Sequence, residues 1–406
     1  MRILHTADWH IGQTLGGWSR DAEHRAFLDH LGTVIEDQAI DALLMAGDVF
    51  DGINPSGDAQ KLLYGAIAGF LRRRPGLTIV MIAGNHDPAA RLEAPQAVLR
   101  DLGVHVLGTL HRTGTDVDMD RHLIPLPDAG GTTRAHVLAV PFLRAADLPG
   151  LTLGAEATGE STVVAATRAL HAAMTQAALA RAGGLPVLAM GHLTCAGGLE
   201  SEGAERRILI GGEHAVPPDI YPSGLAYVAL GHLHRAQSLD GGRVRYAGSP
   251  FPLSATEIPY DHGVTLIDLG DALTHRHIPL PRPVACLRLP DRGAMTLADL
   301  SATLAALQPD PALPRDLHPF VHVTLRPDRP APTLMAEATA LIDAAPLRLA
   351  SLRIERAETA ALPDAAPPSL ADTTPEALFL QAFRAANGTD PDARHLAAFR
   401  DALAEV

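Results

Sequence analysis

The chain has 406 residues, a length that predicts two or three domains. Apolar residues make up 47%, enough for a substantial core, but no apolar run approaches the ~20 residues that a membrane-spanning helix needs, which argues against a membrane protein. Lys and Arg number 33 against 46 Asp and Glu, and the formal charge of −13 excludes a uniformly basic surface.

The start, MRILHTADWH, places Asp and His where a signal peptide stays apolar. The chain has two cysteines, Cys195 and Cys286, which lie far apart and argue against a disulfide framework. Together these features favour a soluble cytoplasmic protein.

Short apolar runs predict strands in the first part of the chain, at 2–7, 41–46, 77–83, 136–140, 186–190, 225–230, 244–247 and 263–269. Helical patterns lie between several of them, at 21–38, 57–74 and 161–181. Buried strands that alternate with helices indicate a layered α/β domain, which we place at 1–280.

A different pattern of apolar and polar residues follows a proline-rich turn at 280–283. It predicts strands at 284–289, 318–325 and 347–356 and helices at 296–307 and 333–345. This order gives a small βαβαβ domain over 281–356.

The segment 357–372 contains Pro363, Pro367 and Pro368 and is interpreted as a linker. A helical hairpin is predicted over 373–406. Its caps are expected at Thr374-Pro375 and Asp390-Pro391, and its first helix is expected to stop at Asn387 and Gly388.

Each hairpin helix has an apolar face, formed by Leu378, Phe379 and Phe383 in the first and by Leu396, Phe399 and Leu403 in the second. A solitary hairpin buries two such faces poorly, so it either docks on a partner or packs back on the body. Three Arg against eight acids from residue 357 onward argue against a DNA-binding tail.

Five blocks place Asp, Asn or His directly after a predicted strand: Asp8-Trp9-His10, Gly47-Asp48, Gly84-Asn85-His86-Asp87, Gly191-His192 and Gly231-His232-Leu233-His234. The carboxyl ends of neighbouring strands in an α/β sheet meet at one crevice, where ligands bind. Side chains two residues apart in an extended chain point the same way, so Asp8 and His10 can form a pair. A glycine before the last four blocks lets the backbone approach closely. The blocks therefore predict one shared site.

The candidate ligands are two carboxylates, one carboxamide and four imidazoles: Asp8, Asp48, Asn85, His10, His192, His232 and His234. Oxygen and imidazole ligands suit Mn, Fe, Zn or Ni and argue against a Cys-rich structural zinc site. Seven ligands are too many for one ion but suit two ions about 4 Å apart that share a carboxylate. Such a pair activates water and stabilises charge on a phosphoryl group, which is the chemistry of phosphoesterases.

Each block alone has a simpler interpretation. A single Asp-x-His at a strand end is common, and among 20 histidines one His-x-His pair can arise by accident. We interpret the following histidines as ordinary surface or core residues: His5, His24, His30, His105, His111, His122, His136, His171 and His262. Coincidence does not explain five blocks that all follow strands.

In this order the blocks resemble the signature of the calcineurin-like metallophosphoesterase superfamily. Finer motifs resemble its SbcD family of bacterial nuclease subunits: ILHTADWHIGQTL, LLMAGDVFDGINPS, VMIAGNHDPAARLE, ALGHLHRAQ and YAGSPFPLSATE. The resemblance implies a layered β-sandwich domain flanked by helices, a small α+β cap domain and a C-terminal helical hairpin.

Carried over by position, the resemblance implies two metal sites, with Mn as the expected metal: Asp8, His10 and His234 for one ion, and Asn85, His192 and His232 for the other, with Asp48 bridging. It gives His86 a catalytic role at the scissile phosphate or the leaving oxygen, oriented by Asp87. Relatives from archaea and eukaryotes often have a second histidine where this chain has Asp51, so the role of that position is open.

The resemblance also implies partners. An SbcC-type ATPase would bind the C-terminal helices, and a homodimer would form within a heterotetramer. An apolar face for the dimer is available at Leu62, Leu63, Ile67, Phe70 and Leu71, although these side chains equally suit covering the sheet. The substrates would be double-stranded DNA ends and hairpins.

The function predicted first is therefore a metal-dependent DNA exonuclease and endonuclease in repair and recombination. Two alternatives remain: a phosphodiesterase acting on a small molecule or another phosphoester, and a non-catalytic scaffold. The acidic composition leaves open whether a local patch or a partner grips DNA, or whether the substrate is not DNA at all.

Overall fold

The computed structural model describes residues 1–148, 162–201, 215–355, 374–387 and 389–404. The chain divides into two compact units, Met1–Glu355 and Arg356–Val406. Within the described residues, no helix is long and apolar enough to cross a membrane.

The first six-stranded sheet has the order β16-β15-β1-β4-β5-β6. Its parallel strands are β1 (Arg2–Thr6), β4 (Ala42–Ala46), β5 (Thr78–Ile82) and β6 (Val104–Leu107). The antiparallel strands β15 (Gly263–Leu269) and β16 (Leu273–Pro279) complete it. Every residue of β4 and β5 is buried, which explains their continuous apolar sequences.

The second six-stranded sheet has the order β13-β14-β12-β11-β10-β9. Its strands are β9 (Leu123–Pro127), β10 (Thr133–Ala139), β11 (Val187–His192), β12 (Tyr227–Gly231), β13 (Gln237–Leu239) and β14 (Val244–Tyr246). Strands β10, β11, β12 and β14 run parallel to one another. The edge strands β9 and β13 run antiparallel to their neighbours.

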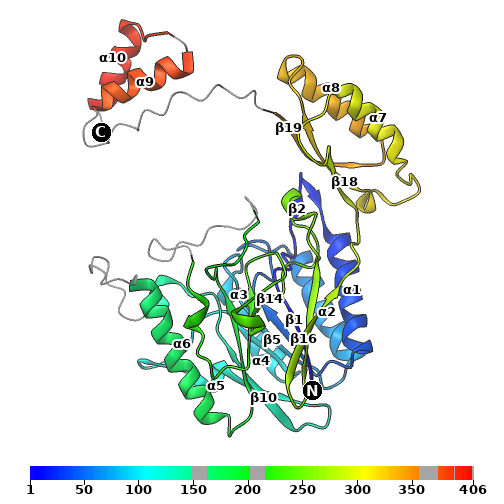
Figure 1. Cartoon of the computed structure of the whole chain (residues 1–406), viewed down its shortest axis with the longest axis vertical. Coiled ribbons are helices and arrows are strands. Elements are labelled where there is room, and N and C mark those ends of the chain that lie inside the picture. Colours follow the sequence, from blue (N-terminus) through cyan, green and yellow to red (C-terminus); the bar gives the residue numbers. More distant parts are fainter. Residues whose placement is uncertain (149–161, 202–214, 356–373, 388, 405–406) are drawn as a thin grey trace. The chain divides into compact units, whose positions relative to one another are not determined.

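The two sheets pack face to face. Their shared core contains Ile3, Leu44 and Val80 from the first sheet together with Leu188 and Ala229 from the second. Helices α1 (Asp21–Asp37) and α2 (Gly57–Arg73) cover the outer face of the first sheet, and α6 (Thr162–Arg181) lies on the second (Figure 1). This layered α/β fold confirms the predicted fold class.

Short elements connect these layers: β2 (Thr14–Leu15), β3 (Trp18–Ser19), α3 (Ala89–Glu93), α4 (Gln96–Arg100), β7 (Arg112–Thr113), β8 (Asp116–Val117) and α5 (Met119–His122). A one-turn helix, η4 (Ala255–Glu257), follows β14.

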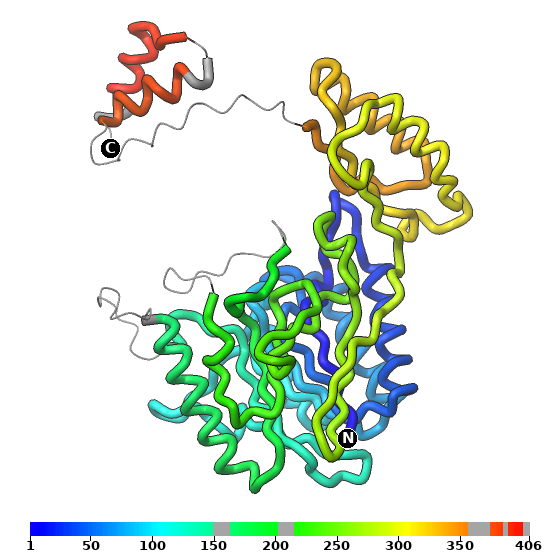
Figure 2. Tube along the Cα trace, in the orientation of Figure 1, coloured from blue at the N-terminus to red at the C-terminus, as the bar shows by residue number. Residues whose placement is uncertain are grey.

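Residues 281–355 follow β16 along the chain trace (Figure 2). They contain a parallel three-stranded sheet. Its elements are β17 (Cys286–Leu289), α7 (Leu297–Leu307), β18 (Phe320–Leu325), α8 (Ala331–Asp343) and β19 (Arg348–Ile354). They form the predicted βαβαβ order around their own apolar core. We call residues 281–355 the cap region.

Buried cationic side chains contact the base of the cap region. Arg20 lies 5.7 Å from the ring centre of Phe320, and Arg348 of β19 donates through Nη1 to the Ser19 carbonyl at 3.4 Å. Trp18 Nε1 also donates to the Leu349 carbonyl at 3.1 Å. These contacts attach the cap region to the segment between β1 and α1.

The second unit contains α9 (Pro375–Asn387) and α10 (Ala393–Ala404). The predicted Thr374 cap accepts from the Ala377 amide at 3.3 Å. The predicted Asp390 cap is wrong: Asp392 accepts from the amides of the next helix, while Asp390 pairs with Arg384. The predicted linker 357–372 and Gly388 lie outside the described residues.

The hairpin helices pack against each other through their aromatic side chains. The Phe379 and Phe399 rings stack with centroids 4.4 Å apart. Even so, Leu378 remains 39% exposed, and Phe379, Phe383 and Phe399 are only half-buried. Part of the apolar surface is therefore still accessible within this unit.

Candidate metal centre

The five predicted blocks converge at the carboxyl ends of strands from both sheets. In the first sheet, β1 leads into Asp8 and His10, β4 into Asp48, and β5 into the block from Asn85 to Asp87. In the second sheet, β11 ends at His192, and β12 leads into His232 and His234. We expected one crevice at the carboxyl ends of neighbouring strands in a sheet, and the structure builds it from strand ends of two facing sheets.

The ligand atoms form overlapping clusters in which all members lie within 4.8 Å: Asp8 with His10 and His234, His10 with Asp48 and His86, and Asp48 with His192 and His232. Asp48 Oδ2 lies 3.6 Å from His10 Nε2 and 3.3 Å from His192 Nε2. Asn85 Oδ1 lies 3.0 Å from His192 Nε2. Asp48 thus stands between two groups of side chains, as a bridging carboxylate must.

The backbone is strained at several of these positions. Asp8, His10, Asp48 and His232 have φ values of 55°, 47°, 53° and 101°, in the region that non-glycine residues rarely adopt. Each such residue costs about 1–3 kcal/mol and persists only where the surrounding fold imposes it. The strain gathers at the predicted ligands, which indicates a functional constraint.

One glycine before a block permits a very close approach. A Cβ added to Gly84 would lie 2.2 Å from Asp48 Oδ1 and 2.4 Å from the Asp48 amide nitrogen. The absence of a side chain at Gly84 therefore lets the loop after β5 lie directly against the central carboxylate.

Two buried atoms at the centre have no hydrogen-bond partner among the described residues: Asp8 Oδ2 and His10 Nε2. Leaving such atoms unpaired away from water costs about 1–3 kcal/mol each. A divalent cation between Asp8, His10 and His234 would satisfy both atoms, and a carboxylate with two imidazoles is a suitable ligand set.

At the other group, the surroundings of His192 favour a positive charge. His192 Nδ1 lies 2.9 Å from the Ala46 carbonyl oxygen, and its Nε2 faces the oxygens of Asn85 and Asp48. Burial opposes a charged ring, but the Asp48 carboxylate outweighs it and raises the pKa of His192 to about 9. Both groups thus fit cations, and the clustered His and Asp side chains suit a dinuclear metal site.

His86 is held by the backbone and remains half-buried. Its Nδ1 donates to the Asp51 carbonyl at 2.8 Å, and its amide donates to Asp48 Oδ1 at 2.9 Å. Because these contacts fix the ring beside Asp48 while leaving it partly accessible to solvent, His86 is suitably placed to reach a bound substrate.

Asp87 contacts the loops of the site. Its carboxylate accepts from the amides of Gly84, Val49 and Phe50 at 2.8–3.1 Å. Burial, followed by the Asp48 charge, raises the pKa of Asp87 to about 6. These bonds join the loops after β4 and β5, so they hold the segment that carries His86 in place.

Two further carboxylates contact the predicted ligands, and the sequence reasoning assigned neither of them a role. Asp51 Oδ1 lies 3.1 Å from His10 Nδ1, and Glu257 Oε1 lies 3.0 Å from His234 Nδ1. Glu257 is the last residue of the YAGSPFPLSATE motif, which was the available signal. Asp51 follows Asp48 by three residues.

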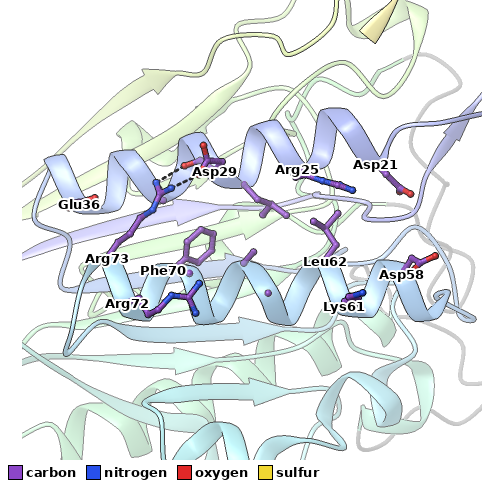
Figure 3. A pocket seen from close by; sticks show the side chains of 15 residues that line it. Asp21, Arg25, Asp29, Glu36, Asp58, Lys61, Leu62, Phe70, Arg72 and Arg73 are labelled. Carbon is purple, nitrogen blue, oxygen red and sulfur yellow. Dashed lines mark hydrogen bonds and ion pairs between the residues drawn. The ribbon is translucent and has the colours of Figure 1, made fainter. Parts of the chain in front are cut away.

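The structure also has a groove of about 840 Å³ between α1 and α2, apart from the metal centre (Figure 3). Leu62 and Phe70 line it together with charged side chains of both signs. Of the five apolar residues considered as a dimer face, Leu63, Ile67 and Phe70 are buried in the core, and Leu62 and Leu71 pack against it. Covering the sheet accounts for most of these side chains.

Comparisons with known proteins agree with this geometry. The calcineurin-like phosphoesterase family matches residues 1–236, and the SbcD_C family, described as the type 5 capsule protein repressor C-terminal domain, matches residues 281–387. A Rhodobacter capsulatus protein, named as the SbcD component of the nuclease SbcCD, is 65% identical over 383 residues, 94% of each chain. The Escherichia coli K12 protein of the same name is 34% identical over 296 residues, 71% of each chain.

Proposed function

The chain belongs to the SbcD family of calcineurin-like phosphoesterases, and on this basis we propose how its centre serves a DNA nuclease. It is a hydrolase of phosphodiesters and the SbcD component of an SbcCD-type nuclease. The substrates that we propose are double-stranded DNA ends and hairpins, cut in DNA repair and recombination. The metal that we propose is Mn²⁺.

The observation that carries this proposal is the convergence of oxygen and imidazole side chains around Asp48. We assign one ion to Asp8, His10 and His234 and the other to Asn85, His192 and His232, with Asp48 shared. Two bound divalent ions supply Lewis-acid activation of water and neutralise charge on the phosphoryl group. The buried Asp8 Oδ2 and His10 Nε2, which lack hydrogen-bond partners among the described residues, favour this assignment.

His86 has a separate role in the proposal. Its Nδ1–H is committed to the Asp51 carbonyl, so Nε2 is the nitrogen that can contact the scissile phosphate or the leaving oxygen. In its imidazolium form, with Nε2 also protonated, the ring can donate the Nε2 proton to the departing oxygen and becomes neutral. Asp87 fixes the loop on which His86 is carried.

The first experiment gives the purified chain Mn²⁺ and a labelled linear or hairpin-ended duplex. Parallel reactions contain chelator, Mg²⁺ alone, or a chromogenic small phosphodiester. Asp48→Ala should abolish cleavage of every substrate, because it removes the ligand shared by both ions. The matched control is Asp101→Ala, at an exposed aspartate that should tolerate the change.

Each outcome separates the candidate functions. Mn²⁺-dependent DNA cleavage that Asp48→Ala abolishes fits the nuclease. Cleavage of the small ester but not of DNA, with or without the ATPase partner, would contradict the DNA substrate. No cleavage of either substrate in the presence of that partner would instead favour a scaffold.

We propose that the ATPase partner binds the hairpin of α9 and α10. The exposed Leu378 and the half-buried phenylalanines leave an apolar surface for a partner helix. Leu378→Glu should weaken ATPase binding, measured by titration, while Ala377→Glu at an exposed neighbouring position should not. Equal binding by both variants would refute the docking surface.

Homodimerisation is also a proposal. The candidate side chains are two exposed apolar residues in and directly after α4: Val98 is 69% exposed and Leu102 is 55% exposed. Val98→Asp should lower the mass measured by light scattering, whereas Leu313→Asp, at another exposed apolar residue in the cap region, should leave it unchanged. The proposed division of the chain remains a phosphoesterase domain at 1–280, a βαβαβ domain at 281–356, a linker at 357–372 and a helical hairpin at 373–406.

A further inference from the structure

The histidines of the two proposed ion positions differ in what holds their outer nitrogen. At the position of Asp8, His10 and His234, both histidines contact a carboxylate through Nδ1: His10 contacts Asp51 at 3.1 Å, and His234 contacts Glu257 at 3.0 Å. At the other position, His192 Nδ1 contacts the neutral backbone carbonyl of Ala46 at 2.9 Å. The outer contacts of His10 and His234 are thus negatively charged, whereas that of His192 is neutral.

An outer carboxylate changes a histidine ligand in two ways. It fixes the proton on Nδ1, which leaves Nε2 as the nitrogen that can bind a metal, and it makes Nε2 more basic. Its negative charge also attracts a cation through the protein interior, where screening by water is weak. A backbone carbonyl fixes the same tautomer but supplies no net charge.

We propose that Glu257 and Asp51 are positioning residues that make the ion position of Asp8, His10 and His234 the tighter of the two. The inference rests on the two-ion assignment proposed above and adds which of the two ion positions binds its metal more tightly. Neither carboxylate needs to touch the metal or the substrate.

Glu257 is held rigidly for this role. Its Oε2 accepts from the Leu253 amide at 2.9 Å, and its Oε1 accepts from the Ser254 hydroxyl at 3.1 Å. The nearby Phe251 ring packs under the buried Arg20 guanidinium at 4.6 Å, which anchors the same loop. These contacts offset the cost of burying a carboxylate and preorganise it against His234.

Glu257 and Asp51 should differ in how much each increases metal affinity. The Glu257 side chain is fully buried, whereas the Asp51 side chain is 40% exposed, so water screens the charge of Asp51 more effectively. Asp51 also contacts His86, but through its backbone carbonyl. A side-chain substitution at Asp51 should therefore alter metal affinity while preserving the contact to His86.

The test is calorimetric titration of the metal-free, full-length chain with Mn²⁺. The unmodified protein should bind two ions with unequal affinities. Glu257→Gln, which keeps the shape and removes the charge, should weaken the tighter step by about 10–100-fold. Asp51→Asn should weaken the same step by a smaller factor. The matched control, Asp41→Asn, removes a buried carboxylate that pairs with Arg74 before β4, and both steps should stay unchanged.

A spectroscopic readout separates positioning from general destabilisation. The absorption spectrum of the first Co²⁺ ion bound should change in Glu257→Gln and not in Asp41→Asn. If Glu257→Gln does not fold, Ser254→Ala provides a second variant, because it removes one hydrogen bond from Glu257 without touching His234. This variant should weaken the tighter step to a lesser degree.

Two results would overturn the inference: unchanged binding constants in the Glu257 and Ser254 variants, or equal weakening of both steps. Failure of the unmodified chain to bind Mn²⁺ would instead overturn the two-metal assignment itself. Because no DNA is present, the test does not depend on which phosphodiester the enzyme cleaves.

Discussion

Replacing Gly84 by alanine should disable the metal centre through one added carbon. Its Cβ would lie 2.2 Å from Asp48 Oδ1 and 2.4 Å from the Asp48 amide nitrogen, and optimal non-bonded contacts lie at about 3.5 Å. The two loops must therefore separate by about 1 Å. Asp48 cannot yield easily, because its carbonyl accepts from the His10 amide at 3.0 Å and its side chain accepts from the His86 amide at 2.9 Å.

The expected loss follows from this displacement. A misplacement of about 1 Å in a catalytic group can lower the rate about 100-fold, and overpacking a core costs about 1–3 kcal/mol. Gly84→Ala should therefore bind Mn²⁺ more weakly, cleave DNA at least 100-fold more slowly and melt at a lower temperature. The shift in melting temperature alone would not account for the lost activity at 25 °C.

The assays are Mn²⁺ titration, single-turnover cleavage and thermal unfolding by circular dichroism. Gly270→Ala is the matched control, because a Cβ there meets no atom within 4 Å and the backbone φ is ordinary. Retention of two bound ions and of cleavage within threefold of the unmodified rate would refute the view that Gly84 is required by close approach to Asp48.

Three further predictions concern other parts of the molecule. His86→Ala should keep both Mn²⁺ ions but turn over at least 100-fold more slowly; loss of an ion on titration would make His86 a ligand instead. Arg348→Ala removes a hydrogen bond to a backbone carbonyl and the contact to Phe320. It should lower the free energy of unfolding, measured by denaturant titration, by about 2–4 kcal/mol. A change below about 0.5 kcal/mol would contradict this. Burial, followed by the Arg245 charge, lowers the pKa of His5 from 6.5 to about 3, so the folded chain keeps this ring neutral while the unfolded chain takes up a proton below 6.5. Stability from His5 should thus fall by about 2 kcal/mol from pH 7 to pH 5, and His5→Gln should lack that part of the pH dependence in parallel denaturant titrations.

The strands that the sequence predicted and those that it missed differ in their position within the sheets. Among the missed strands, β6, β9, β13 and β16 are the four edges of the two large sheets, and β2, β3, β7 and β8 form two short two-stranded sheets. An edge strand is partly exposed and loses the continuous apolar run that signals an interior strand. β16 has four consecutive polar residues in its middle, and β9 contains two prolines, which sheets tolerate at their edges.

The candidate site was predictable to different depths. Residues such as Asp8 and His232 lie in short motifs directly after buried strands, so local spacing was sufficient to find them. Glu257 and Asp51 contact ligands that lie 23 and 41 positions away in the chain, and no local spacing reports such a contact. A residue that acts through a ligand, rather than as one, requires the folded structure to be recognised.

The strained ligands and the unpaired atoms lead to the same conclusion about stability. Asp8 combines a φ of 55° with a buried Oδ2 that has no hydrogen-bond partner among the described residues, and His10 combines a φ of 47° with a similarly unpaired Nε2. Both costs are present in the metal-free chain, and bound cations remove the second but not the first. An ion at 100 times its dissociation constant would stabilise the fold by about 2.7 kcal/mol. The fold therefore holds the proposed ligands in place without a metal, and a bound metal would contribute by pairing the atoms that lack hydrogen bonds.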